Sequence, residues 1–353
     1  MFSEVRTRRR QLVGAAALVI MVIPLAALAQ DGATPEMLQL RLAVTDPNIN
    51  PVTDSVLKLA ETEGYYEKHG VKVEIVRLEG TPQAVAALNA GQVDLADISI
   101  EALLRLRAEN GLAIKGIASA TLGPPYLIAA KCEITKVQDL VGRSFAIADS
   151  GSLDHNLTQH VLAASGVERD GPNFVAIGAP AARVQALAAG RVDATTVSYG
   201  TFLPIAETPG LCVVVSPEDF FKAAPIQSKL VAVLESTIAE KGEALKRFVS
   251  ALVDSSRHFD SDPAAWVETM RRQRDDLSVE NLEATTKFLA GRWCVNGCAN
   301  VEYIQETVDF IYGTPDFDEV KPLTATDVTD DSFVAAAIAE FGPYAGGGID
   351  ARP

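Results

Sequence analysis

The chain has 353 residues, of which 48% are hydrophobic, and a formal net charge of −15 at neutral pH. A charge this negative argues against nucleic acid and anionic lipid as partners. The chain is longer than a single hydrophobic core usually requires, and its length suits two cores.

The N-terminal 29 residues have the organisation of a secretory signal peptide. Four arginines between positions 6 and 10 precede an uncharged stretch from 12 to 26, and small residues up to Ala29 provide a cleavage site. The stretch falls short of the roughly 18 residues that a membrane span needs. Removal of these arginines and Glu4 would take the net charge from −15 to −18 and leave a soluble periplasmic protein. A retained N-terminal membrane anchor is the alternative.

An internal repeat organises the chain that follows. "ALNAGQVDLADIS" at 87–99 and "ALAAGRVDATTVS" at 186–198 align without a gap at an offset of 99 residues. Each copy begins with an alanine-rich helical pattern, which Gly91 or Gly190 should end in the left-handed conformation. An apolar strand follows and ends at a serine. The alternative is that this pattern is ordinary punctuation of alanine-rich helices.

Matching strands flank the two copies. A β-rich stretch precedes each copy, at 71–80 and 173–180, and apolar strands at 40–46 and 143–149 both end in a carboxylate and a polar loop. Strands that alternate with helices predict parallel sheets covered by helices. The sequence therefore predicts an α/β protein with two similar lobes, whose ligand lies at the carboxyl ends of the strands.

The C-terminal part of the chain has a different character. Residues 228–259 and 301–313 carry long helical patterns, and a loop-rich tail at 341–353 ends the chain. We expect these helices to pack on the first lobe and the tail to be flexible.

Four cysteines in an exported protein predict two disulfides, for which three pairings are possible. Cys294 and Cys298 flank a "VNG" turn that would bring them together, which leaves Cys132 and Cys212 as partners. A metal site is not expected, because the four histidines are scattered and no HExxH motif occurs. We expect no cofactor.

Several segments together resemble the periplasmic solute-binding proteins of the nitrate, sulfonate, taurine and thiamine-pyrimidine type, the NMT1-like family. The resemblance covers about residues 40–335. Its most specific segments are "ETEGYYEKHGVKVEIV", "ALNAGQVDLADIS", "PYLIAAK", "VQDLVGRSFAIADSGS" and "ALAAGRVDATTVSYGTF". The resemblance implies a type II periplasmic-binding-protein fold, in which each of two lobes has a mainly parallel sheet flanked by helices.

The resemblance also implies where the lobes begin and end. Two segments that cross between the lobes would lie near residues 129–131 and 212–216. The second lobe would then span 131–212, and the first lobe would combine 40–130 with 213–340.

The candidate cleft loops contain acids but no Lys or Arg. The acids are Asp46, Glu79, Glu101, Asp149 and Asp154. A carboxylate in a closed cleft is costly unless it is paired, which favours a ligand with an amine, an amidine or another hydrogen-bond donor, and Glu101 is the leading candidate. The alternative is that these acids only stabilise the N-termini of helices.

We predict a ligand site built from polar side chains at strand ends and helix starts of both lobes. Its residues are Asn50, Thr81, Ser99, Glu101 and Thr121 on one wall, and Ser152, His155, Ser198 and Tyr199 on the other. Hydroxyls and backbone amides would bind an acidic group, and Glu101 would be free to receive a donor or a positive charge. A zwitterionic sulfonate or a nitrogen heterocycle fits this pattern better than a simple dianion.

The resemblance implies a monomeric solute-binding component of an ABC import system, which captures a small molecule and delivers it to a membrane permease. An enzyme is not expected, because no nucleophile and base occur together in a catalytic pattern. Two alternatives remain open. One is a periplasmic sensing module that reports to a receptor, and the other is an enzyme on the same fold.

Overall fold

The computed structural model describes residues 37–344 and residue 350. The expected signal peptide at 1–29 lies outside the described residues, and so does most of the expected tail at 341–353. Among the helices of the described part, none combines the length and the apolar character that a bilayer span requires.

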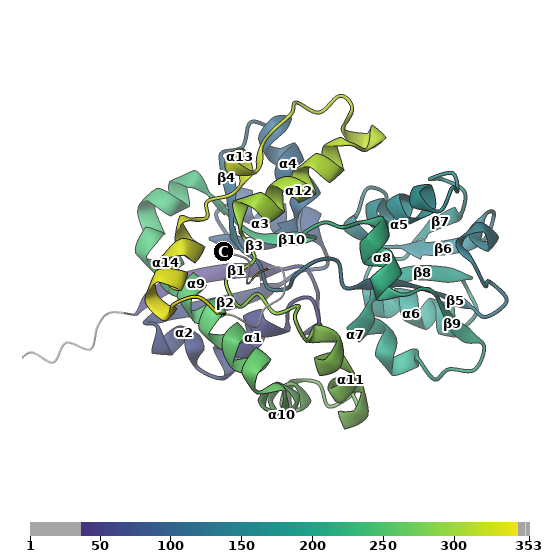
Figure 1. Ribbon diagram of the computed structural model, residues 1–353, viewed down its shortest axis with the longest axis horizontal. Helices are drawn as coiled ribbons and strands as arrows, with labels where there is room; N and C mark the ends of the chain where they lie inside the picture. Colours follow the sequence, from purple (N-terminus) through teal and green to yellow (C-terminus); the bar gives the residue numbers. More distant parts are fainter. Residues whose placement is uncertain (1–36, 345–349, 351–353) are drawn as a thin grey trace, which may run out of the picture. The chain divides into compact units, whose positions relative to one another are not determined.

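Two five-stranded sheets form the framework of the described part (Figure 1). The first sheet has the strand order β2-β1-β3-β10-β4, and the second has the order β7-β6-β8-β5-β9. The strands are β1 Leu38–Val44, β2 Val71–Arg77, β3 Leu95–Ser99, β4 Ile114–Ala118, β5 Tyr126–Lys131, β6 Ser144–Ile147, β7 Asn173–Ala176, β8 Ala194–Ser198, β9 Leu211–Val215 and β10 Lys229–Leu234.

The two sheets share one topology. In the first sheet, β1 pairs in parallel with β2 and β3, and β10 runs antiparallel between β3 and β4. In the second sheet, β6 pairs in parallel with β7 and β8, and β5 runs antiparallel between β8 and β9. Four strands of each sheet therefore point the same way, which confirms the predicted α/β fold with two mainly parallel sheets. We call each sheet with its helices a lobe, the first and the second.

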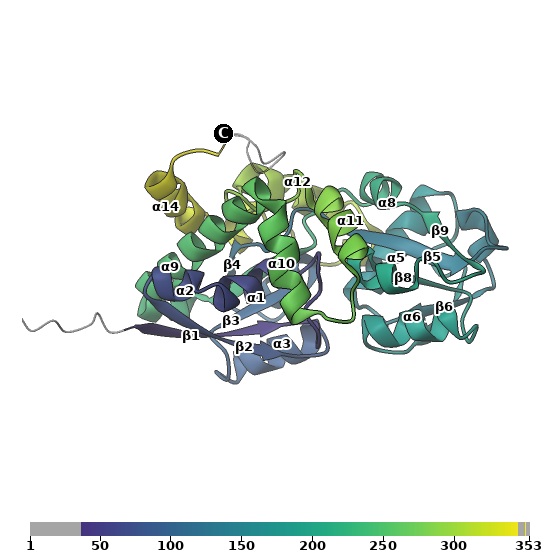
Figure 2. The same ribbon diagram turned by 90° about the horizontal axis from the view of Figure 1, so that it is seen from below.

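Helices pack on both faces of each sheet. In the first lobe, Leu40 and Leu42 of β1 face a core shared with α1 and α9, whereas Ala43 faces a core shared with α3 and α4. Figure 2 shows α1 and α10 on one side of β1 and α3 on the other. The helices are α1 Ser55–Thr62, α2 Tyr65–Lys68, α3 Thr81–Asn89, α4 Ile100–Ala108, α5 Leu153–Ala164, α6 Pro180–Ala188, α7 Tyr199–Phe202, α8 Pro217–Ala223, α9 Glu235–Ser261, α10 Pro263–Gln273, α11 Val279–Leu289, α12 Val301–Tyr312, α13 Ala325–Val328 and α14 Ser332–Phe341.

The sequence repeat forms the same unit in both lobes. Helix α3 leads into β3, and helix α6 leads into β8. Gly91 and Gly190 lie in the two connections with φ angles of +65° and +69°, which residues with a Cβ atom rarely adopt. The predicted order of strand, helix, glycine and strand is therefore confirmed in each copy.

The aspartate of the repeat has a structural role. Asp94 accepts a hydrogen bond from the backbone N–H of Arg41 at 2.9 Å, and Asp193 accepts one from the backbone N–H of Ser144 at 3.0 Å. Each carboxylate thus joins the start of one strand to the neighbouring strand of the same sheet. The aspartate of the shared Val-Asp pair therefore stabilises the sheet in each lobe and is not a ligand-binding residue.

The predicted helix over 228–259 is only partly correct. Residues Lys229–Leu234 form β10, and helix α9 begins at Glu235. After Lys229 the segment is a short apolar run, "LVAVL", which contains two valines, and such a run fits a buried strand as well as a buried helix. Its place between β3 and β4 makes it a strand. The second predicted helix, over 301–313, is confirmed as α12.

Two segments connect the lobes. The first is 119–125, between β4 and β5, and the second is 216–228, between β9 and β10, and includes α8. The crossings expected near 129–131 and 212–216 differ from these positions. Residues 129–131 lie inside β5, because this strand pairs with β8 and β9 along its whole length.

A buried glutamine joins the two crossing segments. The Nε2 atom of Gln227 donates hydrogen bonds to Oγ of Ser119 at 2.6 Å and to the carbonyl oxygen of Thr121 at 2.7 Å. Its Oε1 atom accepts the backbone N–H of Gly123 at 3.1 Å. These bonds hold the two segments against each other at the point where the chain passes between the lobes.

Both predicted disulfides are confirmed. Cys132 and Cys212, whose Cα atoms are 4.9 Å apart, join the far ends of β5 and β9 in the second lobe. Cys294 and Cys298, whose Cα atoms are 5.0 Å apart, close a short loop in the first lobe. The carbonyl oxygen of Gly297 in that loop accepts the backbone N–H of Ser119 at 2.8 Å, so the loop supports the first crossing segment.

Candidate ligand-binding site

A cavity of about 640 Å³ is lined by residues of both lobes. Its wall contains the ends of β3 and β8, the loops after β1, β2 and β6, and the N-terminal turns of α3, α4 and α5. Loops at the carboxyl ends of strands are the usual ligand site of open α/β sheets. The volume lies in the range of cavities that enclose small organic molecules.

Six of the nine expected site residues lie on the wall of this cavity. They are Asn50, Thr81, Ser99 and Glu101 from the first lobe, and Ser152 and Ser198 from the second. Contact of these residues with a ligand stays a prediction.

The other three expected residues do not line the cavity. Thr121 is buried in the first crossing segment, where its carbonyl oxygen accepts the Gln227 amide. His155 packs against Phe174, with ring centroids 4.5 Å apart. Tyr199 stacks on Phe288 of α11 at 4.8 Å. His155 and Tyr199 lie in the first turns of α5 and α7, as expected for helix starts, but their packing partners set the direction of their side chains. Thr121 lies three residues after β4 and not at a strand end.

Asn50 bridges the two lobes at the cavity. Its Nδ2 atom donates to Oγ of Ser198 at 2.9 Å and to Oγ1 of Thr201 at 3.0 Å, both in the second lobe. The hydroxyl oxygen of Ser198 also accepts the backbone N–H of Thr201 and so caps α7. One wall of the cavity is therefore fixed to the other by hydrogen bonds between protein groups.

Asp54 holds the loop that carries Asn50. Its carboxylate accepts the backbone N–H of Asn50 at 2.6 Å and a guanidinium N–H of Arg77 at 3.1 Å. Burial raises the pKa of Asp54 to about 7, the attraction of Arg77 opposes this rise, and the charge of nearby Asp46 adds to it. The positioning of Asn50 thus depends on a carboxyl group that titrates near neutrality.

We expect the free energy of unfolding to decrease as the pH rises from about 4 to 8. A carboxyl group with a raised pKa in the folded chain favours folding while it is protonated, and this contribution is lost as the pH rises through the folded value. Asp350, whose pKa burial raises to about 6, acts in the same direction. In the Asp54→Asn variant, the free energy of unfolding should change between pH 4 and pH 8 by less than in the unsubstituted protein, with a difference on the order of 2–4 kcal/mol. Urea denaturation at several pH values measures the difference.

The exposed Asp331 supplies the control for this experiment. Asp331→Asn should leave the slope of stability against pH unchanged. An Asp54→Asn profile as steep as that of the unsubstituted protein would refute the assignment.

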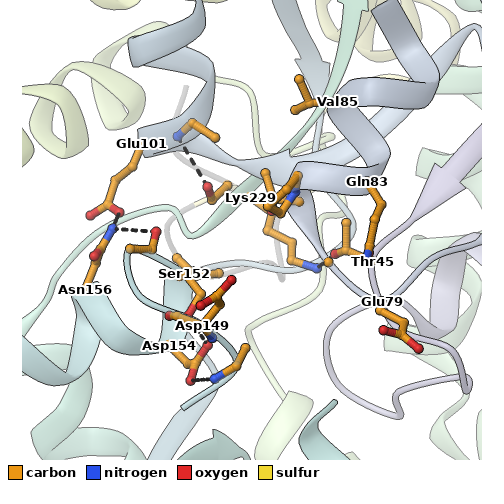
Figure 3. Close-up of a pocket in the computed structure, with 18 of the residues that line it drawn as sticks. Thr45, Glu79, Gln83, Val85, Glu101, Asp149, Ser152, Asp154, Asn156 and Lys229 are labelled. Atoms are coloured by element: carbon orange, nitrogen blue, oxygen red, sulfur yellow. Dashed lines mark hydrogen bonds between the residues drawn. The ribbon is translucent and has the colours of Figure 1, made fainter. Parts of the chain in front are cut away.

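Glu101 is engaged by the second lobe. Its Oε2 atom accepts an N–H of Asn156 at 2.6 Å (Figure 3). Its Oε1 atom lies 3.4 Å from Nε2 of His160, which is also on α5. Glu101 is buried, with 4% of the residue exposed. The expectation that Glu101 is free to receive a donor from a ligand is therefore wrong for this structure, because α5 supplies the donors.

Glu101→Gln should favour separation of the lobes. A neutral amide accepts hydrogen bonds more weakly than a carboxylate, and its NH₂ group would face the donors of α5. We expect the ratio of closed to open protein to fall about tenfold without ligand. Single-molecule fluorescence transfer between one dye on each lobe measures this ratio. Glu243→Gln, which changes an exposed ion pair within α9, is the matched control and should leave the ratio unchanged.

Three cations reach the cavity from elements outside the candidate loops. They are Arg105 from α4, Arg183 from α6 and Lys229 from the start of β10. The loops lack Lys and Arg as expected, but the inference that only hydroxyls and amides can serve an acidic group is wrong. The helix predicted over 228–259 does not bring Lys229 to the cleft, whereas β10 does. No pattern in the sequence around Lys229 marks it as a cavity residue.

Lys229 is a buried cation at the carboxyl end of β3. Its Nζ atom lies 3.3 Å from Oδ2 of Asp97 and donates to Oγ1 of Thr45. Burial by itself lowers the pKa of Lys229, but the negative charges of Asp97, Asp54 and Asp46 outweigh burial and raise the pKa above its usual range. Lys229 is therefore charged, and Figure 3 shows its side chain extending toward Thr45.

Arg183 and Asp154 form the corresponding pair in the second lobe. A guanidinium nitrogen of Arg183, which is 2% exposed, lies 3.7 Å from Oδ2 of Asp154. Asp154 also accepts the backbone N–H of Ala148 at 2.9 Å and the hydroxyl of Ser152 at 2.8 Å. The carboxylate fixes the loop after β6 to the first turn of α5, so Asp154 has a structural role at the cavity wall.

The cavity wall carries more negative than positive groups. Its six carboxylates are Asp46, Glu79, Glu101, Glu109, Asp149 and Asp154, against the three cations named above. Arg105 is paired with Glu109 at 2.7 Å, and Arg183 faces Asp154. In the part of the chain that the structure describes, Asp46, Glu79 and Asp149 have no cationic partner. The wall therefore favours a ligand that brings positive charge or hydrogen-bond donors.

Comparison with protein families finds a match over most of this framework. The profile described as NMT1/THI5 like matches residues 55–265. A provisionally named binding protein of Brucella abortus (strain 2308) is 27% identical over 215 residues, which is 61% of this chain. The match spans 66% of the length of that relative.

Solved structures share the fold at low sequence identity. The alkanesulfonate-binding protein SsuA from Xanthomonas axonopodis pv. citri, bound to MOPS, superposes with a TM-score of 0.65 at 21% identity, over 82% of this chain and 97% of that one. The periplasmic nitrate-binding protein NrtA from Synechocystis PCC 6803 has a TM-score of 0.68 at 14% identity, over 90% and 92%. The desulfurization enzyme DSZB has a TM-score of 0.58 at 13% identity, over 86% and 99%.

Proposed function

This chain belongs to the NMT1/THI5-like family, and from that premise we propose that it is an exported solute-binding protein. It captures one small organic molecule between its lobes in the periplasm and delivers it to the permease of an ABC import system. Similarity to proteins named for binding alkanesulfonate and nitrate supports a binding role.

The observation that carries this proposal is the cavity between two sheets of the same topology. Strand ends and helix starts of both lobes line it, and Asn50 and Glu101 bond directly to the opposite lobe. A ligand that touches both walls gains contacts only when the lobes are together, so it favours the closed form by its differential affinity.

The ligand is a small organic molecule that carries both acidic and hydrogen-bond-donating groups. A zwitterionic sulfonate or a nitrogen heterocycle fits the excess of carboxylates better than a simple dianion does. Lys229 and the hydroxyls of Thr81, Ser99 and Ser198 are the groups that we assign to the acidic part. A cavity of about 640 Å³ is also far larger than nitrate alone requires.

A thermal-shift screen tests the proposal. The panel contains sulfonates, amino-sulfonates, pyrimidines, flavins and small aromatic acids, and a ligand at 100 times its Kd should stabilise the protein by about 2.7 kcal/mol. Mass spectrometry of the bound molecule after long incubation should recover it unchanged. Chemical conversion of the ligand would refute the proposed function.

Two other functions use the same cavity. In a sensing module the closed form would bind a membrane receptor, and pull-down of membrane proteins with and without ligand distinguishes that receptor from a permease. The similarity to DSZB favours an enzyme as the second alternative, and the mass-spectrometric experiment distinguishes it from a binding protein.

A further inference from the structure

The cavity extends beyond the space between the lobes along helix α4. Ala102, Leu106 and Glu109 line it, together with Arg105, and residues at this spacing share one face of a helix. The distance along an α-helix from Ala102 to Glu109 is about 10 Å. The cavity therefore has an elongated part along α4 in the first lobe, which reaches the surface at the exposed Glu109.

Helix α3 forms the opposite side of this elongated part. Pro82 and Val85 of α3 line the same cavity, and Figure 3 shows Val85 and Gln83 away from the Glu101–Asn156 bond. Helices α3 and α4 cover the same face of the first sheet, because their buried residues, such as Leu88 and Leu103, belong to one core. We call the space between them the side arm, with walls formed by Pro82, Val85, Ala102, Arg105, Leu106 and Glu109.

The side arm is apolar at its centre and neutral at its end. Val85 and Leu106 are only half-buried, so their side chains are not fully covered by protein. Arg105 donates to Glu109 at 2.7 Å and to the carbonyl oxygen of Asp316 at 2.7 Å, and its guanidinium lies 4.5 Å from the ring centroid of Phe317. These contacts neutralise the charge of the Arg105 guanidinium and fix its position at the end of the side arm.

We propose that the side arm binds an uncharged, largely apolar body of the ligand, while the charged head of the same molecule lies between the lobes. The inference rests on the proposed function and narrows its ligand to an amphipathic molecule, with a polar head and an alkyl or aryl body. An apolar surface with a few placed polar groups is the usual lining of such a subsite. A solute consisting of a charged head alone would leave Val85 and Leu106 in contact with water.

Two probe series test the inference by calorimetry. One consists of ethane-, butane- and hexanesulfonate, and the other of the corresponding primary alkylamines. In the series whose head group is bound, the hexyl member should bind roughly 10- to 100-fold tighter than the ethyl member. Val85→Trp fills the arm and should abolish this dependence on chain length while ethyl binding is retained.

Ala86→Trp is the matched control, because Ala86 is the next residue of α3, is exposed and does not line the cavity. It should keep the dependence on chain length. Ala102→Leu, from the α4 side, is the second filling variant if Val85→Trp does not fold. A dependence that survives in a folded filling variant overturns the inference, and so does equal or absent binding of all probes by the unsubstituted protein. Chemical conversion of a bound probe would overturn the proposed function and leave the side arm in place.

Discussion

Lys229→Met should lower the free energy of unfolding by about 3–5 kcal/mol at pH 7. Lys229 is 9% exposed, and its partner Asp97 is 1% exposed. In the described part, Oδ1 of Asp97 has no hydrogen-bond partner, so loss of the ammonium group leaves the carboxylate buried without compensation. Urea denaturation measures the loss.

The pH dependence and a second substitution check the cause of this loss. An unpaired Asp97 takes up a proton more readily, so the cost of Lys229→Met should shrink as the pH falls. Asp97→Asn added to Lys229→Met should recover most of the stability. Lys241→Met breaks the pair between the partly exposed Lys241 and Asp94, which keeps its contacts with the backbone N–H and the guanidinium of Arg41. It should cost less than about 1 kcal/mol. Equal losses for Lys229→Met and Lys241→Met would contradict the prediction.

Removal of the Cys132–Cys212 disulfide should cost about 4 kcal/mol, and removal of Cys294–Cys298 about 2 kcal/mol. The first bridge joins residues 80 positions apart and the second joins residues 4 positions apart. A longer closed loop restricts the unfolded chain more, so its loss increases the entropy of that state more. Double Cys→Ser variants, compared in urea without reductant, measure the two costs.

The two disulfide variants serve as controls for each other, because each loses one S–S bond and replaces two cysteines by serine. The larger cost should belong to Cys132→Ser with Cys212→Ser. The reverse order would show that the short loop beside Ser119 stabilises the folded state by more than loop closure, through its bond to the first crossing segment.

The repeat shows how much of the fold is local. Helix α3 and helix α6, the two glycines after them and the strands that end at Ser99 and Ser198 follow from hydrophobic periodicity and glycine placement. These signals act over a few residues, so one sequence suffices to find them. The same argument located six cavity residues, since strand ends and helix starts are sequence features.

The errors concern contacts between distant segments. The sequence predicts a helix over residues Lys229–Leu234, but the apolar run after Lys229 is short enough to be compatible with either conformation. Their pairing with β3, about 130 residues earlier in the chain, makes them a strand and brings Lys229 to Asp97. The crossing segments also depend on distant strand pairing. The resemblance predicts them near 129–131 and 212–216, whereas they lie before β5 begins and after β9 ends.

The sequence alone determined the two-lobed α/β fold, the disulfide pairs and the family, because these depend on composition, periodicity and motif order. Tertiary structure alone decided the charge of the cavity and the partners of Glu101. Lys229 and Arg183 enter the wall from a strand and a helix that carry no ligand signal, and the donors that occupy Glu101 come from α5, more than fifty residues away. Electrostatic and hydrogen-bond energies depend on distance in space, and that distance is set only when the sheets and helices pack.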